Sequence, residues 1–154
     1  MSQAEKDLKV MWNICRDFFY KWRSVVEEEF GREKARELVK KFWEKVGEGT
    51  AKLYKEHGVN PENLVEIAKA IARSSEIMGE KVEVLAEEDK VIVRHTSCPW
   101  FDWAKMFGLE EEDREGCDIW FKVTVEKMNP RAKVETTKSF ADGDDFCERV
   151  IYFE

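Results

Sequence analysis

The spacing of apolar residues changes about halfway along the chain, and this change is the strongest constraint on the fold. From residue 3 to residue 57, apolar side chains recur every three or four residues, which is the period of one helix face. Phe30-Gly31 interrupts the run, so the pattern predicts two long helices, the second ending at Gly58. The apolar positions of the first helix are Leu8, Met11, Trp12, Cys15, Phe18, Phe19, Trp22, Val25 and Val26.

Beyond a third, shorter helix that ends at Gly79, apolar residues alternate with polar ones, as they do in strands. Two pairs of such segments each predict a β-hairpin: residues 81–86 with 91–95, and residues 132–140 with 146–153. A helical first half followed by two hairpins indicates an α+β fold. We expect amino-terminal helices packed against an antiparallel sheet built from the two β-hairpins.

The stretch between the hairpins is harder to assign. Residues 100–108 predict a short helix and residues 110–116 a charged one. Residues 118–128 fit a strand, because Phe121, Val123 and Val125 alternate with polar residues, but they also fit a helix that stops before Asn129-Pro130. The choice between these two readings decides where the side chain of Cys117 points.

Length and composition indicate a single domain. With 154 residues, of which 43% are hydrophobic, the chain can bury a sizeable core. The expected organisation is one domain over 1–154, with a helical part over 1–78 and a mainly sheet part with inserted helices over 79–154. The single glutamine and the 38% of charged residues resemble the composition of proteins from hot environments.

The charge balance excludes some classes of partner. A net charge of −7 argues against nucleic acid and anionic membranes, because both require a surplus of Lys and Arg on one face. The polar start of the chain does not resemble a signal peptide, and no apolar run approaches the length of a membrane span. Four cysteines without an export signal fit a reducing compartment, so we expect a cytoplasmic protein.

Three cysteines in the second half of the chain and one histidine form the first candidate site. Cys98, Cys117 and Cys147 stand at the edges of predicted segments, and His95 lies three residues before Cys98. Thiolate and imidazole are the groups that bind zinc tetrahedrally, although the chain has no C-x-x-C pair and its spacing matches no known zinc finger. The alternative interpretation is a set of half-buried free thiols.

A catalytic cysteine is the second interpretation of the same residues. Cys98 and Cys117 each precede a predicted helix, and the positive end of a helix dipole lowers the pKa of a thiol. His95 would then be the general base of a Cys-His pair. Cys15, on the apolar stripe of the first helix, is predicted to be a buried filler.

Aromatic residues are dense beside these cysteines. They either line a pocket for a flat ligand or form ordinary core. The residues proposed for the pocket wall are Trp100, Trp103, Phe107 and Trp120.

From about Phe18 to its end, the chain resembles the L-2-amino-thiazoline-4-carboxylic acid hydrolase family. The motifs that carry the resemblance are Phe30-Gly31-Arg32-Glu33-Lys34-Ala35, His95-Thr96-Ser97-Cys98-Pro99, the isolated Cys117, Asn129-Pro130 and Gly143-Asp144-x-x-Cys147. The resemblance implies a hydrolase that opens a thiazoline ring, with the three cysteines near its pocket. The cysteine motifs also resemble the vinyl-4-reductase type of small-ligand-binding or metal-binding domain, whose helices pack on an antiparallel sheet.

Three functional hypotheses follow. The first is a hydrolase-like domain acting on a small sulfur- or nitrogen-containing heterocycle, with Cys98 or Cys117 as nucleophile or metal ligand and His95 as base. The second is a non-catalytic sensor or binding module in which Cys98, Cys117 and Cys147, together with His95, hold zinc. The third is a homo-oligomer formed through the first helix, whose apolar stripe is wide for so small a domain.

Overall fold

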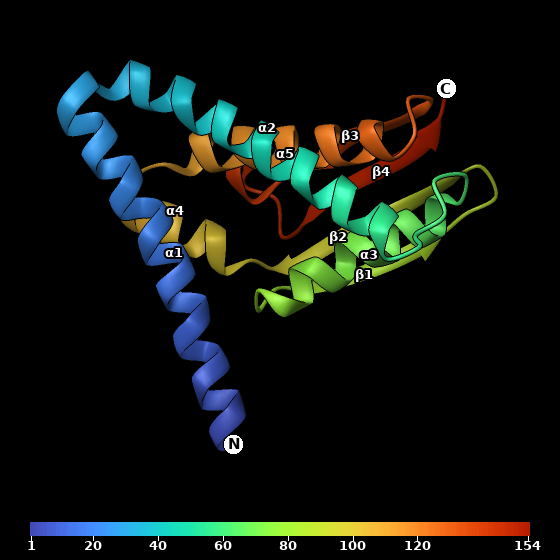
Figure 1. The fold of residues 1–154 in the computed structure, drawn as a ribbon, viewed down its shortest axis with the longest axis horizontal. Helices are drawn as coiled ribbons and strands as arrows, with labels where there is room; N and C mark the ends of the chain where they lie inside the picture. The colour runs from blue at the N-terminus through green and yellow to red at the C-terminus, as the bar shows by residue number, and fades with distance from the viewer.

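The computed structural model describes residues 1–154 as helices around a four-stranded sheet (Figure 1). In chain order the elements are α1 (Gln3–Phe30), α2 (Arg32–Glu56), α3 (Leu64–Ile77), β1 (Lys81–Ala86), β2 (Lys90–Ser97), α4 (Pro99–Phe107), α5 (Glu110–Met128), β3 (Ala132–Lys138), the 3-10 helix η1 (Phe140–Asp142) and β4 (Cys147–Phe153). The α+β class predicted from the sequence is confirmed. None of the helices combines the length and the apolarity needed to cross a bilayer.

The sheet has the order β1-β2-β4-β3, and every neighbouring pair is antiparallel. Both predicted hairpins are present, β1 with β2 and β3 with β4, and the pairing of β2 with β4 joins them into one sheet. The helix α3 packs on β1 and β2, whereas α5 packs on β3 and also against α2. Figure 1 shows α2 and α5 running side by side above the sheet, and α1 extending away from it.

The core lies between one face of the sheet and the two helices that cover it. Strand residues on this face are buried in alternation, because successive side chains of a strand point to opposite faces. The central members of the core are Ile67 and Ile71 from α3, Val91 and Val93 from β2, Phe121 and Val125 from α5, and Ile151 from β4.

Residues 118–128 are helical, and they continue the predicted charged helix without a break. The strand-like alternation arises because α5 has apolar contacts on two sides. Phe121 and Val125 belong to the core against the sheet, whereas Val123 faces α2, where it meets Gly47. Cys117 therefore lies inside α5 and does not precede a helix, which corrects the sequence prediction.

The helix α1 has two different faces. Its inner face buries Arg16, Tyr20, Arg23 and Val26, and Arg23 forms a buried ion pair with Glu112. Its outer face leaves apolar side chains in solvent, including Phe18 with 70% of its surface exposed. Cys15 lies exposed on this helix, so the prediction of a buried filler was wrong. Apolar periodicity did not identify the buried face of α1, because apolar residues surround much of the helix and the inner face includes the buried arginines Arg16 and Arg23.

Self-association through α1 stays a prediction, for which the exposed apolar side chains Leu8, Met11 and Phe18 are the structural motive. Sedimentation of the full chain tests it. We expect Phe18→Glu to lower the mass of an assembly, and a monomeric mass for the unchanged chain would contradict the prediction.

The inner face of α1 also holds the turn between α3 and β1. The indole N–H of Trp12 donates to the carbonyl of Ile77, and Arg16 Nη1 donates to the carbonyl of Met78 at 3.2 Å. The Trp12 ring packs directly on Gly79, where an added Cβ would lie 3.0 Å from the ring. Gly79 has a φ of 87°, which also favours glycine at this position.

Candidate functional site

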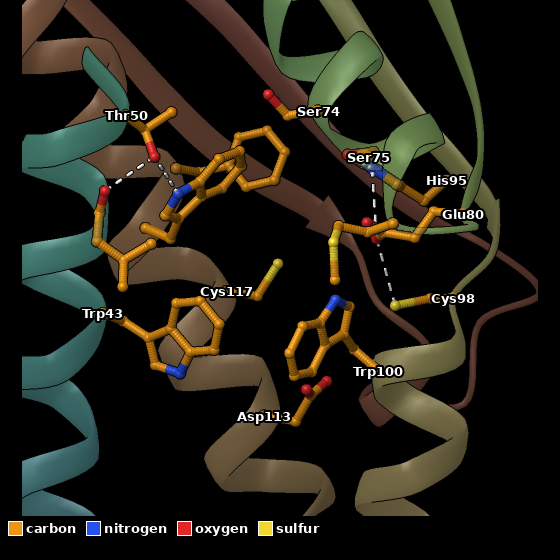
Figure 2. A pocket seen from close by; sticks show the side chains of 14 residues that line it. Trp43, Thr50, Ser74, Ser75, Glu80, His95, Cys98, Trp100, Asp113 and Cys117 are labelled. Carbon is orange, nitrogen blue, oxygen red and sulfur yellow. Dashed lines mark hydrogen bonds and ion pairs between the residues drawn. The ribbon is translucent and has the colours of Figure 1, made fainter. Parts of the chain in front are cut away.

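A cavity of about 290 Å³ opens between α2, α5 and the end of the sheet from which α4 departs. Its lining combines aromatic, thiol and carboxyl side chains from the five elements α2, α3, β2, α4 and α5 and from the turns between them. The lining residues are Trp43, Val46, Thr50, Ser74, Ser75, Met78, Glu80, His95, Cys98, Trp100, Asp113, Cys117, Trp120 and Phe121. Figure 2 shows Glu80, His95 and Cys98 together on one side of the cavity and Trp43 on the opposite side, with Trp100 and Asp113 between them.

The site forms where the core face of the sheet changes from apolar to polar. Along β2 the buried positions are Val91, Val93 and then His95. Along β4 the buried residues that pair with Val91 and Val93 are Ile151 and Arg149, so the same change occurs on the neighbouring strand. The next pair along the two strands is His95 with Cys147, which places an imidazole and a thiol side by side at the sheet end.

The aromatic wall depends on a close approach of α2 to α5. Gly116 leaves room for Trp43, since a Cβ at that position would lie 2.5 Å from Cδ1 of the indole ring. Trp43 in turn packs edge-on against Trp100, with ring centroids 5.8 Å apart. Trp120 is fixed at the other end by a hydrogen bond of 3.1 Å from its Nε1 to Oγ1 of Thr50.

The polar side centres on Glu80, at the end of the turn that α1 holds. The Cys98 thiol donates to Oε1 of Glu80 at 3.5 Å, and His95 Nε2 lies 3.9 Å from the same oxygen (Figure 2). Burial raises the pKa of Glu80 to about 7, although the hydrogen bond from Cys98 opposes this shift. The carboxyl is therefore near the midpoint of its titration at neutral pH.

Asp113 brings a second carboxyl to the same cavity from the first turn of α5. Burial raises its pKa to about 7, and the Arg149 guanidinium opposes this shift. Each of the two carboxyls thus exchanges a proton near neutral pH, and they enter the cavity from different elements.

His95 is neutral. Burial, followed by the neighbouring positive charge of Arg149, lowers its pKa to about 4. Its Nε2 is hydrogen-bonded to Oγ of Ser75 at 2.9 Å, and its Nδ1 has no partner. An imidazole with this pKa is a weak base at neutral pH, so the structure gives the predicted Cys-His pair no support.

The thiols that face the cavity are protonated. Cys98 is the N-cap of α4, as predicted, but burial and then the Glu80 carboxylate raise its pKa well above the usual value. Burial raises the pKa of Cys117 to about 12. The expected lowering by a helix start is outweighed by desolvation. The assignment of either residue as nucleophile stays a prediction.

A second hollow, of about 30 Å³, adjoins the cavity behind the thiols. It shares Glu80, His95, Cys98, Asp113 and Cys117 with the cavity and adds Cys147 and Arg149, so the four residues predicted as a zinc site do meet here. No group of three or more His, Cys, Asp and Glu side chains is arranged to hold a metal ion, however. These residues therefore do not fit zinc in their present arrangement, and the zinc prediction lacks geometric support.

Residues 13–151 match the family model described as L-2-amino-thiazoline-4-carboxylic acid hydrolase. The chain belongs to this family. The match covers most of the sequence, including every residue that lines the cavity. Among curated proteins there is no match.

Three solved structures share the fold with this member of the hydrolase family. One is a trafficking protein particle complex subunit 3 from Naegleria fowleri covalently bound to palmitic acid, with a TM-score of 0.64 and 13% identity, covering 95% of this chain and 96% of that chain. Another is the phenol-responsive sensory domain of the transcription activator PoxR with phenol, with a TM-score of 0.55 and 14% identity over 90% of this chain and 74% of that chain. The third is the SO2144 H-NOX domain from Shewanella oneidensis in the Fe(II)CO state, with a TM-score of 0.52 and 13% identity over 86% and 74%.

Of the four residues predicted to form the pocket wall, two line the cavity and two do not. Trp100 and Trp120 line the cavity, whereas Trp103 and Phe107 are absent from its lining. Both stack instead on Tyr20 of α1, with centroid distances of 6.1 Å and 4.9 Å. Positions three and seven residues beyond Trp100 lie on nearly the same face of α4, but they lie farther along the helix, where this face meets Tyr20 of α1 instead of the cavity.

The sequence did not lead us to Glu80, Asp113 or Arg149 as site residues. Arg149 had a readable signal, since it occupies an inward position of β4 between Cys147 and Ile151. Glu80 follows the helix-ending Gly79, which weakly marks a positioned residue. Asp113 could not be recognised from the sequence. It is the last residue of the acidic run Glu110–Asp113, and only tertiary packing distinguishes its environment from that of its neighbours.

Proposed function

We propose that the chain binds a small heterocycle containing sulfur and nitrogen, such as a thiazoline carboxylate, and opens its ring by hydrolysis. The observation that carries this proposal is that two half-buried carboxyls, Glu80 and Asp113, line one cavity and that desolvation raises both of their pKa values to about 7. Groups that titrate near the working pH are the most effective general acids and bases. Membership in the family supports the reaction class.

The reaction needs one carboxyl in each protonation state. In a 2-amino-thiazoline, the carbon between ring sulfur and ring nitrogen is the electrophile. The ionised carboxylate takes a proton from water as its oxygen bonds to this carbon, while the protonated carboxyl donates to the ring nitrogen. The carbon–sulfur bond then breaks as the new hydroxyl becomes a carbonyl. The hydroxyl proton returns to the carboxylate that served as the acid, and the departing sulfur takes up the proton that the base had removed. Water is consumed, and the product is an open chain with a carbonyl and a free thiol.

The remaining lining suits a flat ring. Trp43, Trp100 and Trp120 give the cavity three indole surfaces, and aromatic walls bind planar ligands with little loss of conformational entropy. Cys98 would act on Glu80 rather than on the substrate. Its thiol donates to the carboxylate and so stabilises the ionised form, which is the form that a base requires.

Glu80→Gln and Asp113→Asn test the acid–base assignment. We expect each variant to lower turnover of 2-amino-thiazoline-4-carboxylate by about 10²- to 10⁴-fold, the usual contribution of a general acid or base, while the ligand still binds. Turnover is followed as the gain of one water by mass spectrometry. Asp102→Asn, on the first turn of α4 and outside the cavity lining, is the matched control and should keep full activity. Full activity in both cavity variants would refute the assignment.

A second candidate function is ligand binding without turnover. The observation that favours it is the predominantly apolar cavity, in which a neutral aromatic compound needs no chemistry to be held. The fold shared with a phenol-responsive sensory domain is compatible with such a role. Saturable binding of the thiazoline with no product after prolonged incubation would favour this candidate over hydrolysis.

A further inference from the structure

The small hollow behind the thiols contains two buried polar atoms without partners. Arg149 is 2% exposed and His95 is 4% exposed, and neither Nε of the arginine nor Nδ1 of the histidine makes a hydrogen bond. Both residues line the hollow. Unpaired buried polar groups are rare in native proteins because their desolvation is uncompensated, so this pair indicates a missing partner.

Two contacts hold the guanidinium of Arg149 in place. Its Nη2 donates to Oδ1 of Asp118 at 3.0 Å, and its guanidinium lies over the Phe121 ring at 4.5 Å from the centroid. Asp118 is further held by Thr136 at 2.7 Å and by Arg114 at 2.8 Å. The guanidinium is thus fixed in place, and the direction of its free N–H is set by these contacts.

The free atoms are suited to an anion. Arginine keeps its proton in proteins, so Nε of Arg149 is always a donor. In the tautomer in which the Ser75 hydroxyl donates to Nε2 of neutral His95, the imidazole proton is on Nδ1, which is then a second donor. Arg149 and Arg114 are the cationic side chains of the hollow. Its carboxyls are Glu80 and Asp113, whose pKa values burial raises to about 7, and the thiols of Cys98, Cys117 and Cys147 add only weak donors.

The hollow also has the size of a small functional group. A water-sized atom needs about 10–15 Å³ of such space, so a volume of about 30 Å³ holds roughly two oxygen atoms. Because the hollow shares five lining residues with the aromatic cavity, a group attached to a ring in the cavity can reach it. A negatively charged ring substituent with two oxygen atoms is a carboxylate.

We propose that this hollow is the subsite for the carboxylate of a heterocyclic acid, bound by Nε of Arg149 and Nδ1 of His95 while the ring lies against the tryptophans. The inference rests on the proposed binding of a heterocycle and assigns the residues that bind its carboxylate. The subsite selects ring acids over neutral rings of equal size.

The test compares two flat rings that water does not open, 2-aminothiazole-4-carboxylate and 2-aminothiazole-4-carboxamide, by isothermal titration calorimetry. The full chain should bind the carboxylate about 10- to 100-fold more tightly than the carboxamide, as a charge-assisted pair of hydrogen bonds requires. Arg149→Met should abolish this preference. Arg94→Met, which removes an equal charge from the opposite face of the sheet, should retain it.

His95→Gln gives a second variant in case Arg149→Met does not fold. Its amide replaces Nε2 and can keep the bond to Ser75, but it has no group in place of Nδ1, so the preference should fall several-fold. Equal affinity of the unchanged chain for both rings would overturn the subsite and leave ring binding intact. A preference that survives in both variants would also overturn it. Binding of neither ring would remove the proposed function itself.

Discussion

The two sides of the cavity are built by different physical means. On the aromatic side, close packing of α2 on α5 sets the shape, and Gly116 provides the space that Trp43 occupies. On the polar side, buried groups from the turn before β1, from β2 and from α5 set the protonation states, and desolvation is the largest influence on Glu80, His95 and Asp113. Shape and protonation therefore depend on different groups, and separate variants can address each of them.

The largest expected effect is on the polar side and concerns the pH dependence of stability. Glu80 and Asp113 have folded-state pKa values of about 7, above their values in the unfolded chain. The native state therefore binds more protons, and the stability from these groups is lost as pH rises from about 4 towards 8. Relative to the unchanged chain, Glu80→Gln/Asp113→Asn should gain a few kcal/mol, on the order of 2–4, between pH 5 and pH 8.

Urea unfolding at the two pH values measures this difference. His95, whose pKa is lowered, changes stability in the opposite sense between about pH 4 and pH 6.5, but it is present in both proteins and cancels in the comparison. A difference between the two proteins that does not change with pH would show that the carboxyls ionise normally.

The next effect is on the aromatic side. Gly116→Ala should destabilise the fold by about 1–3 kcal/mol, because the added methyl group meets the Trp43 ring and the wall must shift. Gly49→Ala is the matched control on α2. Nothing lies within 4 Å of a Cβ at that position, so it should stabilise by about 0.5–1 kcal/mol. Thermal unfolding measures the sign of the stability change in both variants. Equal shifts in melting temperature would mean that the contact of Gly116 with Trp43 does not set the position of the aromatic wall.

The smallest expected effect concerns the thiols between the two sides. Cys15 is exposed, whereas burial raises the pKa of both Cys98 and Cys117. At pH 7 iodoacetamide should therefore modify Cys15 first and Cys98 and Cys117 much more slowly, because the thiolate is the reactive form. Mass spectrometry of digested protein gives the order, with Cys15→Ser as the control. Rapid modification of Cys98 would restore the nucleophile hypothesis.

The sequence predicted the fold in most respects because its apolar periods are clear in the long helices and in the hairpins. It left residues 118–128 of α5 open between strand and helix, because apolar contacts on two sides imitate a strand. It failed for the buried face of α1, where arginines replace apolar residues. His95 and Cys147 meet through the pairing of β2 with β4, which belong to different hairpins, so no hairpin turn in the sequence sets this register. The burial of Asp113 depends on contacts between elements distant in sequence, and no local pattern contains that information.

The anchoring of the turn at Gly79 by α1 has a consequence for the chemistry. Trp12 and Arg16 hold the backbone carbonyls of residues 77 and 78, one turn before the carboxyl of Glu80 enters the cavity. The outer helix and the acid are therefore parts of one mechanical unit. A displacement of α1 along its axis would move Trp12 and Arg16, and with them the turn that leads to Glu80. It would thereby change how far water reaches the Glu80 carboxyl.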